Sequence, residues 1–217
     1  GTKPWCSLAA DLSHALVTAW VSADERRLFA LDLRGPGVLA RTGPWHARGL
    51  RNVVSAPVDL SGARAVPVGE AGWYLNRPGF AHGGVGVAAC WWGGAFPLRD
   101  ALRTAAATER ADQLARVHLG RADTALWAAG AVLRDTAAAF EAGTAAPGLL
   151  AARARTVIAD AVETVLDVAA RALGPLPLVA DEAHARRVAD LQVYVRQHHA
   201  ERDLDRIGRD ILRAESA

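Results

Sequence analysis

The periodicity of the apolar residues changes once along this sequence, near residue 77, and that change limits the fold more than any other feature. Before it, short alternating apolar runs are separated by Gly, Pro, Asp and Asn, a pattern typical of strands and turns. Beyond residue 98 the chain is alanine-rich, and apolar residues recur at i, i+3, i+4 and i+7, which indicates helices. The expected strands are 15–21, 27–33, 53–60 and 65–68, and the expected helical segments are 111–142, 149–173, 181–197 and 200–213.

These patterns predict an α+β chain of two domains. Residues 1–76 are expected to form a small antiparallel β-barrel-like domain, and residues 77–217 a four-helix bundle with a last amphipathic helix. The join between them is glycine-rich, with glycines at 83, 84, 86, 93 and 94. Glycine within a helix costs about 1 kcal/mol relative to alanine. We therefore expect a helix buried on all sides there, approached closely by a flat ligand or by another helix.

Composition excludes several classes of protein. The 217 residues (22.9 kDa) are 51% hydrophobic, which excludes a disordered chain. The net charge of +2, with acids and bases interleaved, argues against nucleic-acid binding. The two cysteines, Cys6 and Cys90, have no metal-ligand spacing, so we expect a reduced cytoplasmic protein without a metal site. No apolar stretch is long enough for a membrane span, and the preference for Arg over Lys indicates a GC-rich, bacterial genome.

The order of several short motifs resembles one known family. The chain starts Gly-Thr-Lys-Pro-Trp-Cys-Ser before an apolar strand, continues through the Arg34-Gly35-Pro36-Gly37 turn and Val66-Pro67, and enters the glycine-rich helix at Gly72-Trp73. This succession is similar to the β-domain and the C-terminal helical domain of the acyl-CoA dehydrogenase family. The resemblance covers essentially the whole chain, and the family's N-terminal helical domain is missing from it.

The resemblance implies FAD as the cofactor. Trp5 would lie against the isoalloxazine ring and the Ser7 hydroxyl near its N5 atom, since a flat ring favours an aromatic face. Arg110 would donate to the pyrophosphate, although the family's Arg-x-x-Phe-Gly motif is otherwise absent. Gly174 is the one glycine left of the family's turn on the adenine side, where Pro175 and Pro177 have removed amide donors. The alternative for Trp5 is a core anchor, and for Arg110 a solvated arginine.

The catalytic base is not assigned by the resemblance. Many members of the family carry a glutamate near the C-terminus, and the matching segment here, 194–203, has no carboxylate at that position. His198, His199 and His82 are the candidates, because histidine can accept a proton near neutral pH. The alternatives are that the histidine pair at 198–199 caps or lines a helix junction, and that His82 belongs to the core.

The resemblance implies FAD-dependent α,β-oxidation of an acyl thioester. Electrons would pass to an electron-transfer flavoprotein or to oxygen, and the chain would work as a homo-oligomer or beside a chain that supplies the missing helical domain. Two alternatives remain: a flavin-dependent monooxygenase on the same fold, and a catalytically silent partner subunit. The acyl chain length stays open.

Overall fold

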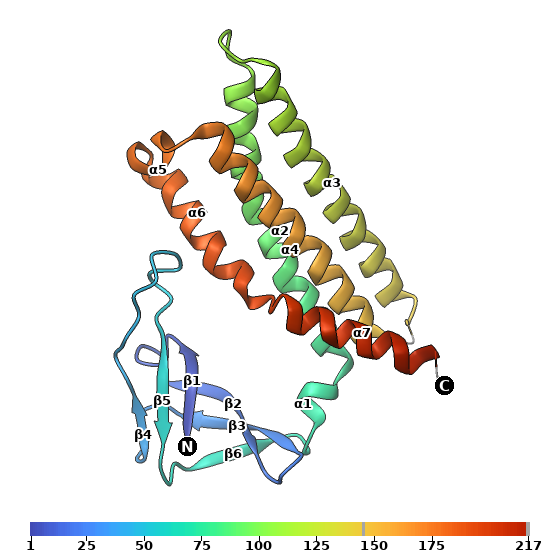
Figure 1. Cartoon of the computed structure of the whole chain (residues 1–217). Coiled ribbons are helices and arrows are strands. Elements are labelled where there is room, and N and C mark those ends of the chain that lie inside the picture. The colour runs from blue at the N-terminus through green and yellow to red at the C-terminus, as the bar shows by residue number, and fades with distance from the viewer. Residues whose placement is uncertain (145, 216–217) are drawn as a thin grey trace. The chain divides into compact units, whose positions relative to one another are not determined.

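The computed structural model describes residues 1–144 and 146–215, which divide into two compact units, Gly1–Phe80 and Ala81–Ala217 (Figure 1). The strands are β1 (Thr2–Ser7), β2 (His14–Trp20), β3 (Arg26–Asp32), β4 (Val38–Ala40), β5 (Ser55–Leu60) and β6 (Ala65–Val68). The helices are α1 (Trp73–Asn76), α2 (Pro78–Ala106), α3 (Gln113–Glu141), α4 (Pro147–Leu173), α5 (Leu176–Ala180), α6 (Glu182–Tyr194), the 3₁₀ turn η1 (Val195–Gln197) and α7 (Glu201–Glu215). The α+β class is confirmed.

The first unit contains two antiparallel three-stranded sheets. Their orders are β1-β5-β4 and β2-β3-β6. The core between them contains Val17 and Leu31 from the second sheet and Val58 from the first. The expected barrel-like description is loose, because the described strands form two open sheets and no closed barrel. Alternation along β2 and β3 provides one apolar face for this core, and closure of the sheet is not needed to bury it.

A glycine turn and a short helix complete the β-unit. Gly37 has φ +79°, and a Cβ at this position would collide with the carbonyl oxygen of Ser61. Only glycine fits there, which explains the turn between β3 and β4. At the other end of the unit, the Gly72 amide donates to the Arg26 carbonyl at 2.7 Å and α1 begins.

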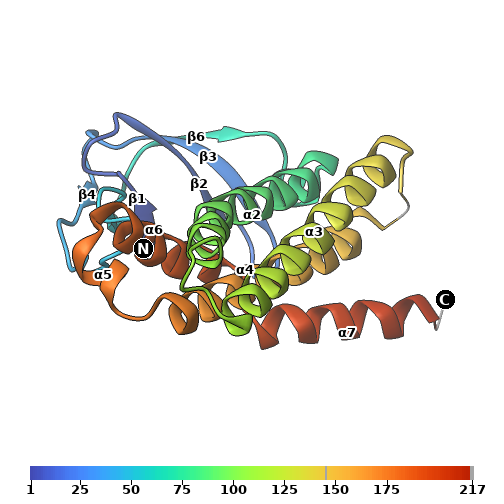
Figure 2. The same cartoon turned by 90° about the horizontal axis from the view of Figure 1, so that it is seen from above.

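The helical unit is built around α4. Its buried residues recur at helical spacing and pack against buried residues of α2, α3 and α6. Asp112 caps α3 by accepting from the Ala115 amide at 2.9 Å, and Asp181 caps α6 by accepting from the His184 amide at 3.1 Å. α2, α3, α4 and α6 run along a common direction, whereas α7 runs at an angle to them (Figures 1 and 2).

α2 is buried on one face only, so the expectation of a fully buried helix is wrong. Its buried residues follow a spacing of three and four: Ala88, Trp91, Ala95, Leu98 and Leu102. A Cβ added at Gly83, Gly86 or Gly93 would meet no atom within 4 Å. These glycines therefore do not serve a close helix crossing within the described residues.

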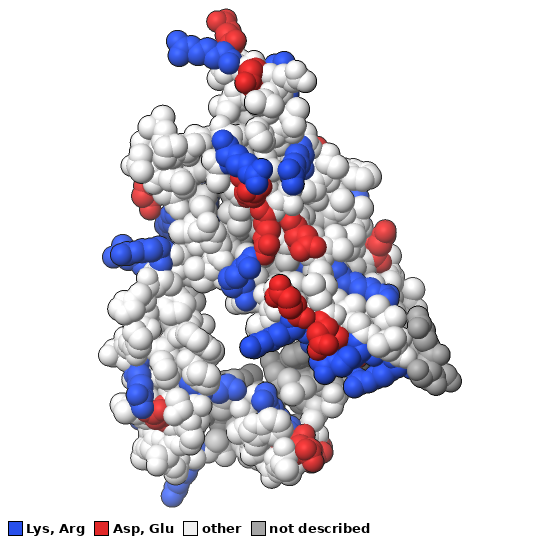
Figure 3. Space-filling view, viewed as in Figure 1, with Lys and Arg blue, Asp and Glu red and all other residues white. Residues whose placement is uncertain are grey.

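Charges of both signs alternate over the visible face of the helical unit (Figure 3). Several are paired between helices, as Arg99 with Asp123 at 3.0 Å. In the described part of the chain, no helix combines the length and the apolar character that a bilayer crossing requires.

Candidate functional site

The exposed face of β1 carries the two residues that the sequence assigns to a flavin. The register of β1 against β5 shifts between Lys3 and Cys6, which marks a bulge. Trp5 and Ser7 are both exposed, whereas Cys6, between them, packs against the core. The Trp5 side chain is 73% exposed, so the alternative of a core anchor is wrong. A flat aromatic surface thus lies open beside a hydroxyl.

The Ser7 hydroxyl belongs to a short hydrogen-bond chain. Its Oγ lies 2.7 Å from Oγ of Ser55, the residue opposite it on β5. Ser55 donates its own hydrogen to the Val53 carbonyl at 3.1 Å. Because a hydroxyl has one hydrogen, Ser7 is then the donor to Ser55, and its lone pairs remain available. Ser55 was not singled out by the sequence, since its partner lies 48 residues away.

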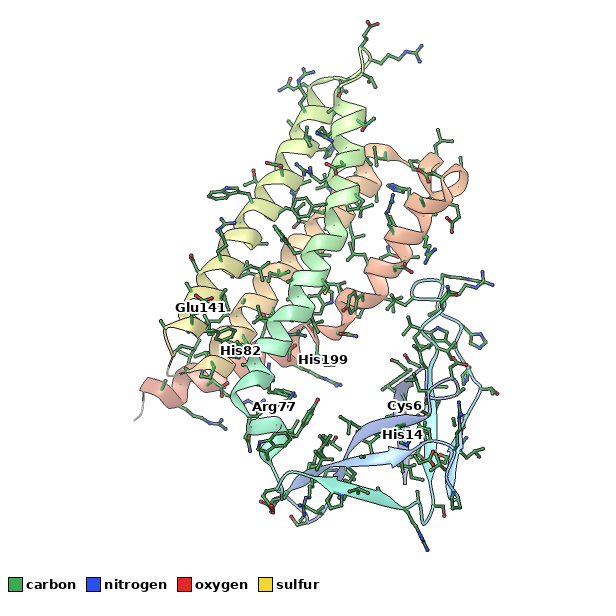
Figure 4. All side chains as sticks on the ribbon, turned by 180° about the vertical axis from the view of Figure 1, so that it is seen from behind. Cys6, His14, Arg77, His82, Glu141 and His199 are labelled. Carbon is green, nitrogen blue, oxygen red and sulfur yellow. The ribbon has the colours of Figure 1, made fainter. Side chains whose placement is uncertain are left out.

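Behind this face is a hollow of about 210 Å³ in the β-unit, and Cys6 contributes to its wall. The other lining residues are Leu8, Ala9, Ala10, Asp11, Arg41, Thr42, Val54 and Ala56. Burial raises the pKa of the Cys6 thiol, and the nearby Lys3 opposes this only in part. The thiol is therefore protonated at neutral pH and a weak nucleophile. Figure 4 labels its position.

The junction between α6 and α7 holds two of the three candidate histidines. His198 is 8% exposed, and its Nε2 lies 3.0 Å from Oγ1 of Thr156 on α4. Its backbone amide donates to the Val195 carbonyl at 2.9 Å. Burial lowers the pKa of His198, with Asp203 opposing the shift and Arg155 adding to it. The ring is consequently neutral at pH 7.

His199 lies at the same junction and differs from His198 in exposure. Its side chain is 64% exposed, and Figure 4 labels its position. Its backbone amide donates to Oδ2 of Asp203 at 3.0 Å, and its Nδ1 lies 3.8 Å from the same oxygen. Arg206 lies 3.6 Å from the other carboxylate oxygen. Asp203 is thus the centre of charge at this junction.

Arg155 connects three segments of the helical unit. Its Nη1 donates to the Gly84 carbonyl of α2 at 2.6 Å, and its Nη2 to the Gln197 carbonyl of η1 at 3.2 Å. The guanidinium carbon lies 4.7 Å from the centre of the Trp91 ring, in a cation–π arrangement. Burial lowers the pKa of Arg155, with Asp203 opposing, yet guanidinium remains charged.

The remaining predicted residues lie elsewhere. His82, on α2, has its ring 4.2 Å from that of Phe140 at the end of α3 (Figure 4). Arg110 is exposed between α2 and α3 and makes no ion pair with a described residue. Gly174 ends α4 at φ +64°, and its amide already donates to the Ala170 carbonyl at 3.2 Å. Gly174 is therefore not a free amide donor.

Arg155, Thr156 and Asp203 were missed by sequence reasoning. Their partners lie on other elements, so no local pattern reveals them. The one available signal is that Arg155 and Thr156 interrupt the alanine-rich, largely buried start of α4. Across residues 1–144 and 146–215 no group of three or more His, Cys, Asp or Glu is placed to hold a metal ion.

With both units described, the fold can be compared with known structures. The butyryl-CoA dehydrogenase of Megasphaera elsdenii aligns with a TM-score of 0.83 at 18% identity, over 98% of this chain and 59% of that one. The Tcur3481-Tcur3483 steroid acyl-CoA dehydrogenase gives 0.83 at 19%, over 100% and 60%. An acyl-CoA dehydrogenase complexed with FAD from Bacillus anthracis gives 0.73 at 15%, over 89% and 38%. No protein-family model and no curated protein matches the sequence.

The chain has the fold of part of an acyl-CoA dehydrogenase, comprising the middle β-domain and the C-terminal helical domain. The resemblance identified from the sequence is confirmed at this level. The chain spans 60% or less of the length of each of the three compared structures.

Proposed function

We propose that this protein is a flavoprotein that oxidises an acyl thioester between Cα and Cβ. The observation that carries the proposal is the open face of β1, where the indole of Trp5 is exposed beside the Ser7 hydroxyl. The fold, shared with structures named as a butyryl-CoA dehydrogenase and as an FAD complex, supports the same assignment.

The residues on this face fit a flavin. An aromatic side chain exposed on a strand offers a stacking surface for a planar ring. The Ser7 hydroxyl can accept a hydrogen bond while donating to Ser55, or donate to a ligand when Ser55 turns toward it. Arg110 has no described ion pair and is free for a phosphate, whereas the Gly174 amide is already used. Bound FAD would supply the two-electron oxidation that side chains alone cannot perform.

The wider assignments belong to the same proposal. Electrons would leave to an electron-transfer flavoprotein or to oxygen. The protein would act in a bacterial cytoplasm, as a homo-oligomer or beside a chain that supplies an N-terminal helical domain. The electron acceptor and the association follow from the family resemblance, whereas the bacterial cytoplasm follows from the preference for Arg over Lys and from the cysteine usage.

The test is anaerobic addition of butyryl-CoA to the FAD-loaded protein. Oxidised flavin absorbs at about 450 nm, and substrate oxidation would bleach this band. The expected result is bleaching by the thioester and none by free CoA. Protein that binds FAD without bleaching by any acyl-CoA of short, medium or long chain would contradict the oxidation.

A second candidate function is a catalytically silent partner subunit. It is favoured by the α6–α7 junction, where the largely buried carboxylate of Asp203 already accepts from the His199 amide and lies 3.6 Å from Arg206, so it is not free to act as a base. A colourless protein that FAD does not reconstitute would favour this function.

A further inference from the structure

Two consecutive residues of α4, Arg155 and Thr156, form hydrogen bonds to the α6–α7 junction. Arg155 donates to the Gln197 carbonyl at 3.2 Å, and Thr156 contacts His198 at 3.0 Å. Arg155 also holds the Gly84 carbonyl of α2 at 2.6 Å. Gln197 and His198 are therefore each hydrogen-bonded to α4, whereas, among the described residues, His199 is not.

The hydrogen bonds of Thr156 determine the tautomer of His198. The Thr156 hydroxyl donates its single hydrogen to the Ala152 carbonyl at 3.0 Å, as threonines inside helices often do. The His198 Nε2 must then be the donor to Thr156, which places the hydrogen of the neutral ring on Nε2. Nε2 of the buried His198 already carries a hydrogen and donates it to Thr156, so this nitrogen cannot take up a proton.

His199 has the complementary properties. Its backbone amide fixes the Asp203 carboxylate at 3.0 Å, and Nδ1 of its ring faces that carboxylate at 3.8 Å. The same Asp203 oxygen also lies 3.9 Å from Nε2 of His198, so the carboxylate is at ionic distance from both rings, and it is exposure that distinguishes His199 from His198. The side chain is 64% exposed, so the ring is open to solvent and to a ligand.

We propose that the two histidines of the junction have different roles: Arg155 and Thr156 are positioning residues that fix His198, and the exposed His199, whose backbone amide is bonded to Asp203, accepts the substrate proton. The proton role rests on the proposed function. As the Cα–H bond breaks, the proton binds Nε2 of His199 and later leaves to solvent. Bound flavin would supply the acceptor for the hydride from Cβ, so that the substrate would lose two hydrogens and two electrons in all.

The positioning part is tested on the full chain without cofactor or activity. Long-range ¹H–¹⁵N spectra of histidine-labelled protein report the tautomer of each ring. We expect His198 in the Nε2–H form at neutral pH, a change of its signals in Thr156→Val and their recovery in Thr156→Ser. A His198 ring with the hydrogen on Nδ1, or signals unaffected by Thr156→Val, would overturn the positioning.

The proton role is tested with the FAD-loaded protein. General acid–base groups contribute about 10²–10⁴-fold to a rate. His199→Gln is expected to slow bleaching by butyryl-CoA at least about 100-fold with FAD still bound. His198→Gln is the matched control. It should lower the free energy of unfolding and slow the bleaching much less than His199→Gln does.

If butyryl-CoA bleached the flavin of His199→Gln at the wild-type rate, this result would overturn the proton role. If the wild-type protein is not bleached, the proposed function fails and the proton role fails with it. The tautomer measurement then still decides the positioning, so the two failures are distinguishable.

Discussion

At the scale of single residues, what matters is which groups are already bonded to one another. The sequence pointed to Trp5, Ser7 and the histidines at 198 and 199, because these residue types match a family motif or a proton-transfer chemistry. It could not reveal Thr156 or Ser55, whose bonds to His198 and Ser7 join positions 42 and 48 residues apart. Nor could it separate a buried histidine from an exposed one at adjacent positions.

The buried His198 predicts how stability changes with pH. Burial lowers its pKa below the ordinary value of 6.5, so the unfolded chain binds a proton more readily than the folded one. The stabilisation is complete above that value and is lost as the pH falls below it. Urea unfolding at about pH 7.5 and about pH 5.5 should show this loss, and His198→Gln should reduce it. An equal pH dependence in the variant would contradict the assignment.

At the scale of elements, long periodic segments were predicted well and irregular ones were not. The expected helix 149–173 corresponds to α4, Pro147–Leu173, and the expected strand 65–68 to β6. β1 was missed because it contains Pro4 and a bulge, and β4 because it has three residues. The glycine-rich α2 was expected to be buried all round, since a sequence pattern does not show which side of a helix faces its neighbours.

The glycines of α2 give a prediction at this scale. A Cβ at Gly86 would meet no atom within 4 Å, so Gly86→Ala should raise the free energy of unfolding by about 1 kcal/mol through helix propensity alone. The matched control is Gly94→Ala, whose Cβ would lie 3.3 Å from Cδ1 of Leu191, and its gain should be smaller. Urea unfolding measures both. A lower free energy of unfolding for Gly86→Ala would contradict this prediction, because it would mean that the face of α2 at Gly86 is packed against another part of the protein.

The core of α4 gives a second prediction for an element. Ile158 is fully buried among α2, α3 and α6 residues. Ile158→Ala should lower the free energy of unfolding of the helical unit by about 2–5 kcal/mol, because the apolar contact is lost and a cavity remains. Denaturation followed by circular dichroism at helical wavelengths checks this. The exposed Val157→Ala is the control, and an equal loss there would contradict the packing.

At the scale of the whole molecule, the fold class and the succession of a β-unit and a helical unit were predictable, because the change of period near residue 77 reports both. The barrel-like description was looser, since strand alternation shows that a sheet has one buried face and not whether the sheet closes. The two sheets, β1-β5-β4 and β2-β3-β6, instead share one core.

Association is the prediction that belongs to the whole molecule. The outer face of the β2-β3-β6 sheet exposes Leu16, Trp20 and Val66, with Leu16 and Val66 on either side of Ala30, and exposed apolar side chains on one face favour an interface. We expect sedimentation at micromolar concentration to give a mass above the 22.9 kDa of one chain. Leu16→Ser should lower that mass. A stable monomer would count against an oligomer of this chain alone.

The most direct measurement of the central claim is a fluorescence titration of FAD with the purified protein and two tryptophan variants. Stacking on an aromatic side chain contributes about 0.5–1.5 kcal/mol beyond the area it buries, so Trp5→Ala should weaken FAD binding roughly 2- to 13-fold. Trp20 is a matched control, because it is also exposed on a strand, at 59%, and already lies under the Arg26 guanidinium. Trp20→Ala should bind FAD as the wild type does. Wild-type protein that binds no FAD, or equal binding by Trp5→Ala, would contradict the account.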